Sequence, residues 1–526
     1  MRRVSRRAVL GLLAGGTAAA GLGIGGASMV PTTTGRLLRS DLELPEPFTV
    51  PLPVPRPIAP ESVSGDADVY RLAQRAVEAE ILPGVRTGIW GYNGTFPGPL
   101  FDVRAGRTVR VEIANELPVP TSTHLHGGVT PPESDGYPTD VTISRDGGFR
   151  PHMRGHNGME LSPEDWTFHD GVRAYDYPLP QRAATLWYHD HRMDFSAPQV
   201  WRGLAGMFIV RDDTDDALPL PEGDRDIPLM VCDRAFTAEG ELSYPALDPS
   251  LREIPGVQDA FMDGVTGDIN LVNGAPWPEL EVSGTRYRFR LLNAANARRY
   301  RFALEPAPQE GPPFVQVGSD QGLLAEPVEL AALAMSPGER RDVVVDFSGY
   351  PVDTEIRLVN RLAEGAQRNV MRFRVTRREN DDAEVPRRLA DVEVLRPDDA
   401  VRTRTFDFRR VLVGGSGGNM NWTVNGAAFE PGTPLADPEL GTVERWRLAS
   451  DFHHPVHIHL AHFQVLSRNG RDPGPQDAGW KDTVDVRPYE VVEVLARFDG
   501  FRGRYMLHCH NLEHEDMAMM ADFDVV

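Results

Sequence analysis

Cysteine is scarce in this chain: two residues, Cys232 and Cys509, occur among 526. So few cysteines exclude a disulfide-built scaffold, and the lack of cysteine pairs at short spacing excludes the usual structural zinc sites. In an oxidising compartment, one disulfide between the two is the simplest prediction. Cys232 lies in the apolar stretch DIPLMVCDRAF, where a buried inert thiol is common. The surroundings of Cys509 are different, as the histidines show.

Basic residues are outnumbered, with 55 Lys and Arg against 76 Asp and Glu. The first 30 residues hold four arginines and no acidic residue, so 51 basic residues remain against 76 beyond them. Such a chain repels phosphate backbones and anionic membranes. We therefore expect no nucleic-acid partner. At roughly 150 residues per domain, the length predicts three domains.

The chain opens with MRRVSRRAVLGLLAGGTAAAGLGIGGASMV, a basic start followed by an uncharged Ala/Gly/Leu run. This is the layout of a secretory signal, and Ser5-Arg6-Arg7 resembles the twin-arginine type, which exports folded proteins. An N-terminal membrane anchor is the alternative, but the many glycines make the run weakly apolar. We expect residues 1–30 to be removed, leaving a monomer in the cell envelope or outside the cell, without membrane contact.

Histidine is absent from the whole middle of the chain, between His191 and His453. The 15 histidines concentrate at the two ends, where four His-x-His pairs occur. Their frequency alone predicts about 0.4 such pairs. Surface histidines make one pair easily, but four pairs confined to two regions indicate metal binding. The pairs are His124/His126, His189/His191, His457/His459 and His508/His510.

The spacing of each pair suits a strand, where residues i and i+2 project from the same face. In His508-Cys509-His510 the two imidazoles then face one way and the thiolate the other. One short strand can thus contact two metal centres joined by a few covalent bonds. This arrangement is typical of electron transfer.

Copper is the metal that this donor set favours. A cysteine thiolate with two histidines and a distant methionine is the ligand set of a blue copper site. Cys509, His514 and Met519 are close in sequence, and His454 is the candidate for the second histidine. Zinc is the alternative, but a catalytic zinc site made of histidines alone would leave most of the pairs unused.

The motifs THLHGG, WYHDH, HPVHIH and HCHNLEHEDMAM resemble the four copper-binding motifs of multicopper oxidases. Their context is similar to the branch of bacterial spore-coat laccases, bilirubin oxidases and phenoxazinone synthases. The resemblance runs from about Thr49 to Val526. It implies an all-β fold of three cupredoxin-like Greek-key domains, with four copper ions per chain.

The resemblance also implies which residue binds which ion. It leaves His152, His156, His169, His453 and His462 as structural or surface residues. The implied ligands are His454, Cys509 and His514 with axial Met519 for type 1 copper; His124 and His457 for type 2; and His126, His189, His191, His459, His508 and His510 for the type 3 pair.

A sequence pattern recurs three times: Asn-Gly, a turn with proline, a glycine and an alternating strand. Repetition, period-two alternation and the absence of a long amphipathic helix indicate duplicated β-sandwich domains. The middle domain has no histidine, so we expect a spacer, with the three-copper cluster between the outer domains. The predicted segments are a signal peptide (1–30), an extended Pro-rich arm (31–47) and domains at 48–213, 225–377 and 405–526.

The function implied by the resemblance is oxidation of phenols, aminophenols or bilirubin-like pigments, with dioxygen reduced to water. Electrons would enter from a small aromatic donor at the ring edge of His514, which the family exposes. Reduction of dioxygen also needs protons, and two acids match positions where this branch keeps a proton-handling group. These are Asp135 in PPESDGYP and Glu515 directly after His514.

Two other functions stay open at this point. A cuprous-ion oxidase usually carries a methionine-rich insert, whereas here Met517, Met519 and Met520 cluster only beside the axial position. An electron-transfer cupredoxin or a copper-binding coat protein belongs to a different class. A plain electron carrier needs only the type 1 ligands, so the other eight paired histidines count against it.

Overall fold

The repeated Asn-Gly pairs form tight turns. The computed structural model describes residues 34–145, 163–413 and 419–526. Asn93-Gly94, Asn273-Gly274 and Asn425-Gly426 adopt positive φ angles at both residues: 53° and 68°, 50° and 85°, 55° and 81°. Two successive positive φ angles give the two-residue turn whose twist matches that of its flanking strands. The repetition predicted from the sequence is therefore present in the backbone.

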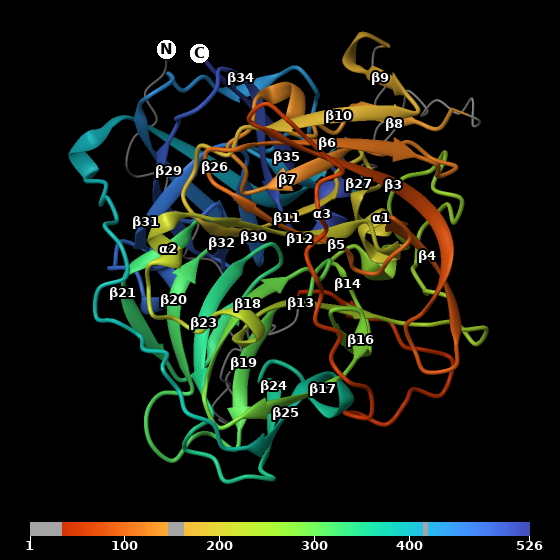
Figure 1. The fold of residues 1–526 in the computed structure, drawn as a ribbon. Coiled ribbons are helices and arrows are strands. Elements are labelled where there is room, and N and C mark those ends of the chain that lie inside the picture. The colour runs from red at the N-terminus through yellow and green to blue at the C-terminus, as the bar shows by residue number, and fades with distance from the viewer. Residues whose placement is uncertain (1–33, 146–162, 414–418) are drawn as a thin grey trace, which may run out of the picture. The chain divides into compact units, whose positions relative to one another are not determined.

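Strands dominate the described chain (Figure 1), which confirms the prediction of an all-β fold. Two sheets, which we call the first sheet pair, use the strands from Ser62 to Arg211. One sheet has the order β10 (Val172–Tyr177), β6 (Thr108–Asn115), β3 (Ala67–Glu80), β2 (Ser62–Ser64), with β4 (Arg86–Tyr92) also on β3. The other has the order β5 (Gly98–Arg104), β12 (Ala205–Arg211), β11 (Ala184–Asp190), β7 (Thr123–His126).

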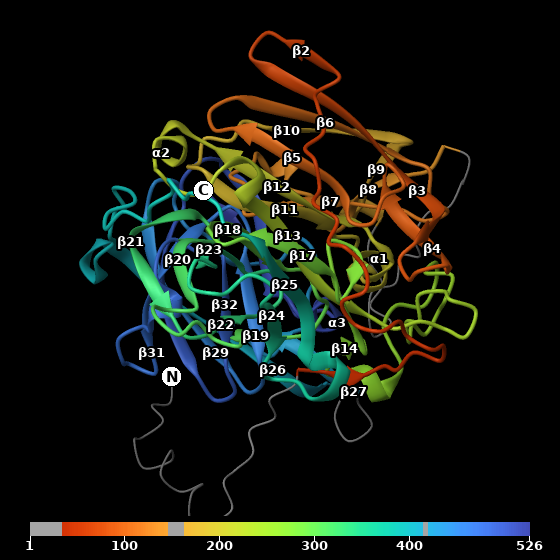
Figure 2. The ribbon, with the colours of Figure 1, turned by 60° about the horizontal axis from the view of Figure 1, so that its bottom comes forward.

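The middle sheet pair uses the strands from Asp226 to Arg377. In both ribbon views β18, β23, β20 and β21 run side by side in that order (Figures 1 and 2). Its larger sheet is β16 (Ala275–Pro276), β15 (Ile269–Val272), β13 (Asp226–Arg234), β18 (Arg286–Asn293), β23 (Arg340–Asp346), β20 (Phe314–Ser319), β21 (Gly322–Leu330). Its smaller sheet is β17 (Glu279–Ser283), β25 (Asn369–Arg377), β24 (Glu355–Asn360), β19 (Tyr300–Glu305), β22 (Leu333–Met335).

The last sheet pair uses the strands from Ala400 to Val525. One sheet is β27 (Asn419–Val424), β26 (Ala400–Val413), β29 (Val443–Ser450), β33 (Val491–Arg497), β31 (His462–Arg468). The other is β28 (Pro434–Ala436), β35 (Met520–Val525), β34 (Gly503–Cys509), β30 (His454–Ile458), β32 (Thr483–Val486). Two short ladders complete the described strands: β1 (Arg36–Leu37) with β14 (Val265–Thr266), and β8 (Asp140–Ile143) with β9 (Thr167–Asp170).

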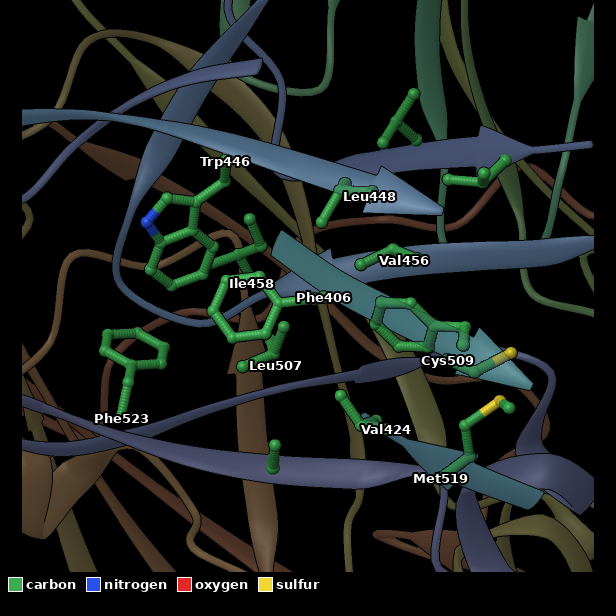
Figure 3. Close-up of a cluster of buried hydrophobic side chains, with 14 of the residues drawn as sticks. Phe406, Val424, Trp446, Leu448, Val456, Ile458, Leu507, Cys509, Met519 and Phe523 are labelled. Atoms are coloured by element: carbon green, nitrogen blue, oxygen red, sulfur yellow. The ribbon is translucent and has the colours of Figure 1, made fainter. Parts of the chain in front are cut away.

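Alternation along the strands builds the core of each sheet pair. In β31, every second side chain of HFQVLSR is buried, as period-two patterning requires. The alternating inward residues of the last sheet pair, among them Phe406, Trp446 and Phe523, form one apolar cluster (Figure 3). By contrast, β13 is buried along nearly its whole length because both of its faces are covered: Leu229 and Val231 pack in one apolar cluster, and Met230 and Cys232 in another.

In the described chain the α-helices are few and short: α1 (Ser196–Arg202), α2 (Asp213–Asp216) and α3 (Leu512–Asp516). The carboxylate of Asp516 in α3 accepts hydrogen bonds from the backbone N–H groups of Ser196 and Ala197 at the start of α1, at 2.8 and 2.9 Å. This contact ties the end of the chain to the first sheet pair. Among the described residues, none of the helices has the length and apolar character needed to cross a membrane.

The three sheet pairs follow one another along the chain, but the predicted boundaries at 48–213, 225–377 and 405–526 stay a prediction. The predicted signal peptide lies outside the described residues. The described part of the Pro-rich arm, from residue 34 onward, contains no helix and includes β1, which pairs in parallel with β14.

Candidate metal centres

All four His-x-His pairs lie at the ends of buried strands. His124 is in β7 and His189 in β11, and the two are opposite each other across an antiparallel pair. His457 in β30 is opposite His508 in β34 in the same way. Because neighbouring strands carry the pairs in register, their imidazoles gather on one side of each sheet.

The eight paired histidines form one buried group, which we call the histidine cluster. Their ring nitrogens fall into three sets, and within each set the donor atoms lie within 4.8 Å of one another. Every set combines histidines of the first and the last sheet pair. The sets are His124, His126 and His457; His126, His189 and His510; and His191, His459 and His508.

His124 and His457 face each other through Nε2 atoms that carry no hydrogen. Nδ1–H of His124 donates to the carbonyl of Asp135 at 2.6 Å, and Nδ1–H of His457 donates to the carbonyl of Asp482 at 3.0 Å. Burial lowers the pKa of both rings, which keeps them neutral. A neutral ring that donates through Nδ1 carries only a lone pair on Nε2. The two Nε2 atoms are 3.4 Å apart, so they repel each other unless a cation lies between them.

Asp135 is the first of the predicted acids, and it lies against the cluster. Its carboxylate accepts a hydrogen bond from Nδ1 of His459 at 2.7 Å and one from the Thr130 hydroxyl at 3.3 Å. Burial raises the pKa of Asp135 to about 8. A carboxyl group that titrates near neutral pH is suited to exchange protons.

Glu515, the second predicted acid, lies on the opposite set of rings. Its Oε2 is 3.1 Å from Nδ1 of His508 and its Oε1 is 3.7 Å from Nδ1 of His191. Burial by itself would raise the pKa of Glu515, but these two rings bring it below the usual range for a glutamate. These two predicted acids therefore have pKa values shifted in opposite directions.

Asp482, immediately before β32, is an acid of the cluster that sequence reasoning missed. Its carboxylate accepts a hydrogen bond from Nε2 of His126 at 3.0 Å, besides the bond from His457 to its carbonyl. No histidine precedes or follows it closely in GWKDTVDV. The only local signal was a Lys-Asp pair directly before the short buried strand β32, which is weak.

The middle sheet pair is more than the spacer we predicted. Arg340 of β23 donates from Nη1 to the Asp482 carboxylate at 2.7 Å. A Cβ on Gly338 would lie 3.0 Å from Cδ2 of His510 and 3.1 Å from Cε1 of His126. This segment supplies no histidine, yet its backbone packs directly on the imidazoles.

A second centre, which we call the Cys509 pocket, lies wholly within the last sheet pair and α3. Nδ1 of His454 is 3.3 Å from Sγ of Cys509, and Nδ1 of His514 is 3.6 Å from the same sulfur. The two Nδ1 atoms are 3.1 Å apart, and all three residues are buried. Two imidazoles and one thiolate thus converge on one point, which is a donor set for a transition metal.

Met519 is buried in the same apolar cluster as Cys509. Its backbone carbonyl accepts a hydrogen bond from the Cys509 N–H at 3.1 Å. In Figure 3 the two sulfur atoms lie at the same end of the cluster, where the side chains of Cys509 and Met519 extend toward the same space. Its role as axial ligand stays a prediction.

The disulfide between Cys232 and Cys509 is not formed. Both thiols are free and buried, Cys232 in β13 of the middle sheet pair and Cys509 in β34 of the last. Desolvation raises the pKa of the Cys232 thiol, as expected of an inert cysteine in an apolar core.

The expectation of an exposed His514 edge is wrong in this structure, where His514 is 0% exposed. The indole of Trp422 in β27 stacks on it with ring centroids 3.8 Å apart and an angle of 28°. Trp422 is held there because its Nε1–H donates to the carbonyl of Met262 at 3.0 Å. The role of His514 in electron entry stays a prediction.

The histidines left outside the ligand set have ordinary partners where the structure describes them. Nε2 of His169 is 2.7 Å from Asp140, and Nε2 of His462 is 3.2 Å from the carbonyl of Gly127. Nδ1 of His453 is 3.4 Å from Asp485. His152 and His156 lie outside the described residues.

Comparisons with known proteins agree with this geometry. Sequence models described as multicopper oxidase match residues 74–154, 137–215 and 398–526. A laccase of Bacillus subtilis (strain 168) is 34% identical over 91% of this chain and 98% of its own length. A bilirubin oxidase of Albifimbria verrucaria is 35% identical over 95% of this chain and 86% of its own.

A solved structure is also similar: a laccase from Pediococcus acidilactici superposes with a TM-score of 0.77 at 30% identity. The match covers 93% of this chain and 96% of that one. It confirms the predicted fold class, three cupredoxin-like β-sandwich domains.

Proposed function

Because this chain belongs to the multicopper oxidase family, we propose that it oxidises phenolic, aminophenolic or bilirubin-like donors and reduces dioxygen to water. The chain is a copper-dependent oxidoreductase with dioxygen as acceptor. Its cofactor is copper, as one type 1 ion, one type 2 ion and a type 3 pair. The donor classes rest on the names of two relatives, a laccase and a bilirubin oxidase.

The buried ring nitrogens fit copper ions. Among the described residues, Nδ1 of His126, Nε2 of His189 and both ring nitrogens of His510 have no hydrogen-bond partner. An unpaired buried polar atom costs about 1–3 kcal/mol. Several such atoms in one set of rings therefore indicate bound cations. Imidazole nitrogen with thiolate sulfur, as in the Cys509 pocket, is a donor set that copper prefers.

The ligand assignment follows the three sets and the pocket. The type 3 histidines divide between two sites, one for each three-histidine set. Type 1 copper would be held by His454, Cys509 and His514 together with the nearby Met519; type 2 copper by His124 and His457; one type 3 ion by His126, His189 and His510; and the other by His191, His459 and His508.

Bound copper supplies the one-electron transfers and the reduction of dioxygen. The contribution of the chain is a short covalent connection between the two centres. Cys509 belongs to the pocket, whereas His508 and His510 on either side belong to the two type 3 sets. The strand β34 thus joins the pocket to both sets through a few backbone and side-chain bonds.

Protons for the reduction are held by side chains at the cluster. We assign this role to Asp135 and Glu515, whose carboxylates contact Nδ1 of His459 and of His508. Both carboxylates are buried, so bulk water does not reach the rings as freely as it reaches the surface. A carboxylate within hydrogen-bond distance of a ring nitrogen can give and take a proton at that atom.

The observation that carries the proposal is the pairing of the Cys509 pocket with eight further buried histidines. An electron carrier or a storage protein would need only one of these centres. The test is oxygen uptake by copper-loaded protein with a methoxyphenol, 2-aminophenol, bilirubin or Cu(I) as donor. We expect four copper ions per chain and four electrons consumed per dioxygen. A chain that takes up four ions but never consumes dioxygen with any donor would contradict the proposal.

A cuprous-ion oxidase is the second candidate function, and oxygen uptake with Cu(I) as the donor tests it. That activity needs thioethers that an external ion can reach near His514. Met517, Met519 and Met520 are all buried, so the cluster of methionines beside the axial position does not favour it. We expect faster turnover with the aromatic donors than with Cu(I).

We also propose that the chain is exported by the twin-arginine route and acts as a monomer outside the cytoplasm. The motif Ser5-Arg6-Arg7 and the uncharged run after it support export. Replacing Arg6 and Arg7 by lysine should leave the protein in the cytoplasm of an expressing cell, which fractionation measures.

A further inference from the structure

Two aspartates hold the histidine cluster from opposite sides in the same manner. Asp135 of the first sheet pair accepts from His124 through its carbonyl and from His459 through its carboxylate. Asp482 of the last sheet pair accepts from His457 through its carbonyl and from His126 through its carboxylate. Each aspartate thus holds one histidine of its own sheet pair and one of the other.

The contact from Asp482 reaches His126 at Nε2, whereas Asp135 reaches His459 at Nδ1. Nε2 of His126 is also 3.0 Å from the Thr483 hydroxyl, which itself donates to the Asp482 carboxylate. A neutral ring, which burial favours for His126 by lowering its pKa, that donates through Nε2 presents the lone pair of Nδ1. Nδ1 of His126 is buried and has no hydrogen-bond partner among the described residues. The bond to Asp482 therefore decides which nitrogen of His126 is available as a ligand.

Asp482 is held in turn by the middle sheet pair. Both Nη atoms of Arg340 donate to its carboxylate, one to each oxygen, and Gln321 donates to Oδ2. A bidentate arginine–carboxylate pair fixes the orientation of the carboxylate as well as its charge. Arg340 is fully buried, and its Nε–H donates to the carbonyl of Thr185 in β11 at 2.8 Å. This one guanidinium contacts all three sheet pairs.

We propose that Asp482, clamped by Arg340, is a positioning residue for the dioxygen-reducing cluster. It holds His126 in the Nε2–H tautomer, so that Nδ1 is the donor atom to the type 3 site shared with His189 and His510. The inference rests on the proposed function, because it assumes copper at that site. It also gives the middle sheet pair a part in the chemistry, although that pair contributes no ligand.

The experiment compares Asp482→Asn with Asp320→Asn in the copper-loaded full chain. Asp320 is the matched control: it is buried in the same network, accepting from the Arg340 N–H at 2.8 Å and pairing with Lys481 at 2.9 Å. No hydrogen bond or ion pair joins its side chain to a histidine of the described chain. Each variant is dialysed against EDTA, and the copper that remains is counted by mass spectrometry.

Loss of a carboxylate that orients a metal-binding histidine typically costs about 10–100-fold in metal affinity. We expect Asp482→Asn to release cluster copper that much more readily than Asp320→Asn, while the visible colour of the Cys509 pocket stays. EPR, which counts Cu(II) ions whose spins are not paired with a neighbour, should show new signal in Asp482→Asn alone. Equal copper retention and equal EPR spectra in the two variants would overturn the proposal.

Arg340→Lys covers the case in which Asp482→Asn does not fold. Lysine keeps the buried positive charge but loses the bidentate fork. It should shift copper retention in the same direction by a smaller amount; wild-type retention in folded Arg340→Lys would also overturn the proposal. Failure of the proposed function is distinguishable, because wild-type protein would then lack four copper ions or oxygen uptake before any variant is compared.

Discussion

The Cys509 pocket and the histidine cluster, to which we assign the same metal, are built on different physical grounds. The pocket takes its donors from the last sheet pair and α3, and its neighbours are mostly apolar, such as Trp422. The cluster takes its donors from the first and last sheet pairs, and carboxylates contact its rings. The pocket also has polar contacts, such as the Asp451 carboxylate 3.6 Å from Nε2 of His454. Packing nevertheless contributes more to the pocket, whereas hydrogen bonds and buried charge contribute more to the cluster.

This difference matches what each centre has to do. A centre that exchanges single electrons needs little change in its surroundings, so a rigid apolar shell suits it. A centre that reduces dioxygen must also receive protons, which apolar residues do not carry. Changes in the pocket should alter colour and electron entry, and changes around the cluster should alter the reaction with dioxygen.

The largest effect should come from Cys509→Ser, which removes the sulfur shared by the pocket and the link to the cluster. A serine hydroxyl is a poor replacement for a thiolate toward copper. We expect the visible colour and the oxygen uptake to fall to background while the fold persists, as circular dichroism would show. Cys232→Ser is the control, because this free thiol is buried in β13 and belongs to neither donor set; it should change neither. Loss of colour in both variants would contradict the assignment of the coloured copper to the Cys509 pocket.

The next effect should come from Glu515→Gln, which acts on the cluster alone. Glutamine keeps the size of the side chain but cannot shuttle a proton. Loss of a general acid or base typically costs about 10²–10⁴-fold in rate, so reoxidation by dioxygen should slow within that range while reduction of the pocket by donor stays nearly intact. Stopped-flow absorbance separates the two half-reactions.

Glu513→Gln is the matched control for this prediction. Glu513 is also buried in α3, but its carboxylate bonds to Tyr244, Asn296 and the backbone of Val265 instead of a histidine. It should leave reoxidation unchanged. Equal rates in the two variants would remove Glu515 from the proton path.

A smaller effect should come from Gly338→Ala, in the segment of the middle sheet pair that packs on the imidazoles. Gly338 has a φ of 83°, and a Cβ there would press on His510 and His126. Residues held in such a conformation cost about 1–3 kcal/mol, and the contact adds to that cost. We expect a lower urea midpoint and weaker copper retention in the cluster.

Gly365→Ala separates the two causes of that effect. Gly365 has a φ of 59° and no atom within 4 Å of its would-be Cβ. It should lower the urea midpoint through backbone strain alone and leave copper retention unchanged. A similar loss of copper in Gly365→Ala would show that packing on the imidazoles is not the cause.

The smallest effect should come from Met519→Leu, which tests the apolar side of the comparison. Leucine for methionine usually costs less than about 1.5 kcal/mol in a core, so the fold and the cluster should be unaffected. Leucine offers no axial donor, and we expect the reduction potential of the pocket to rise. A redox titration monitored by visible absorbance measures this; an unchanged or lower potential would mean that Met519 is only a core residue.

The sequence was sufficient to predict the strands and the residues that meet. The i, i+2 spacing of the four His-x-His pairs predicted which side chains point the same way, and the structure brings all eight together. The Asn-Gly repeats predicted the turns that return at each sheet pair. These signals are local, because a spacing of two or a turn of two residues depends on neighbours along the chain.

What could not be predicted depends on contacts between distant segments. Asp482 has no histidine near it in the sequence, and only the register of β30 with β32 brings it to the cluster. Arg340 lies in the histidine-free middle of the chain. Trp422 stacks on His514 because the hairpin of β26 and β27 packs against α3. No sequence motif indicates that packing.

The separations along the chain set the order in which the two centres can form. The pocket joins His454 to His514 across 60 residues, whereas contacts that join the first and last sheet pairs at the cluster span 317 to 356 residues. Longer closures cost more chain entropy and form later during folding. We therefore expect a newly made chain to complete its coloured centre before its dioxygen-reducing centre. Colour alone then does not report a finished enzyme, and the oxygen uptake per unit of colour measures the fraction of molecules whose assembly is complete.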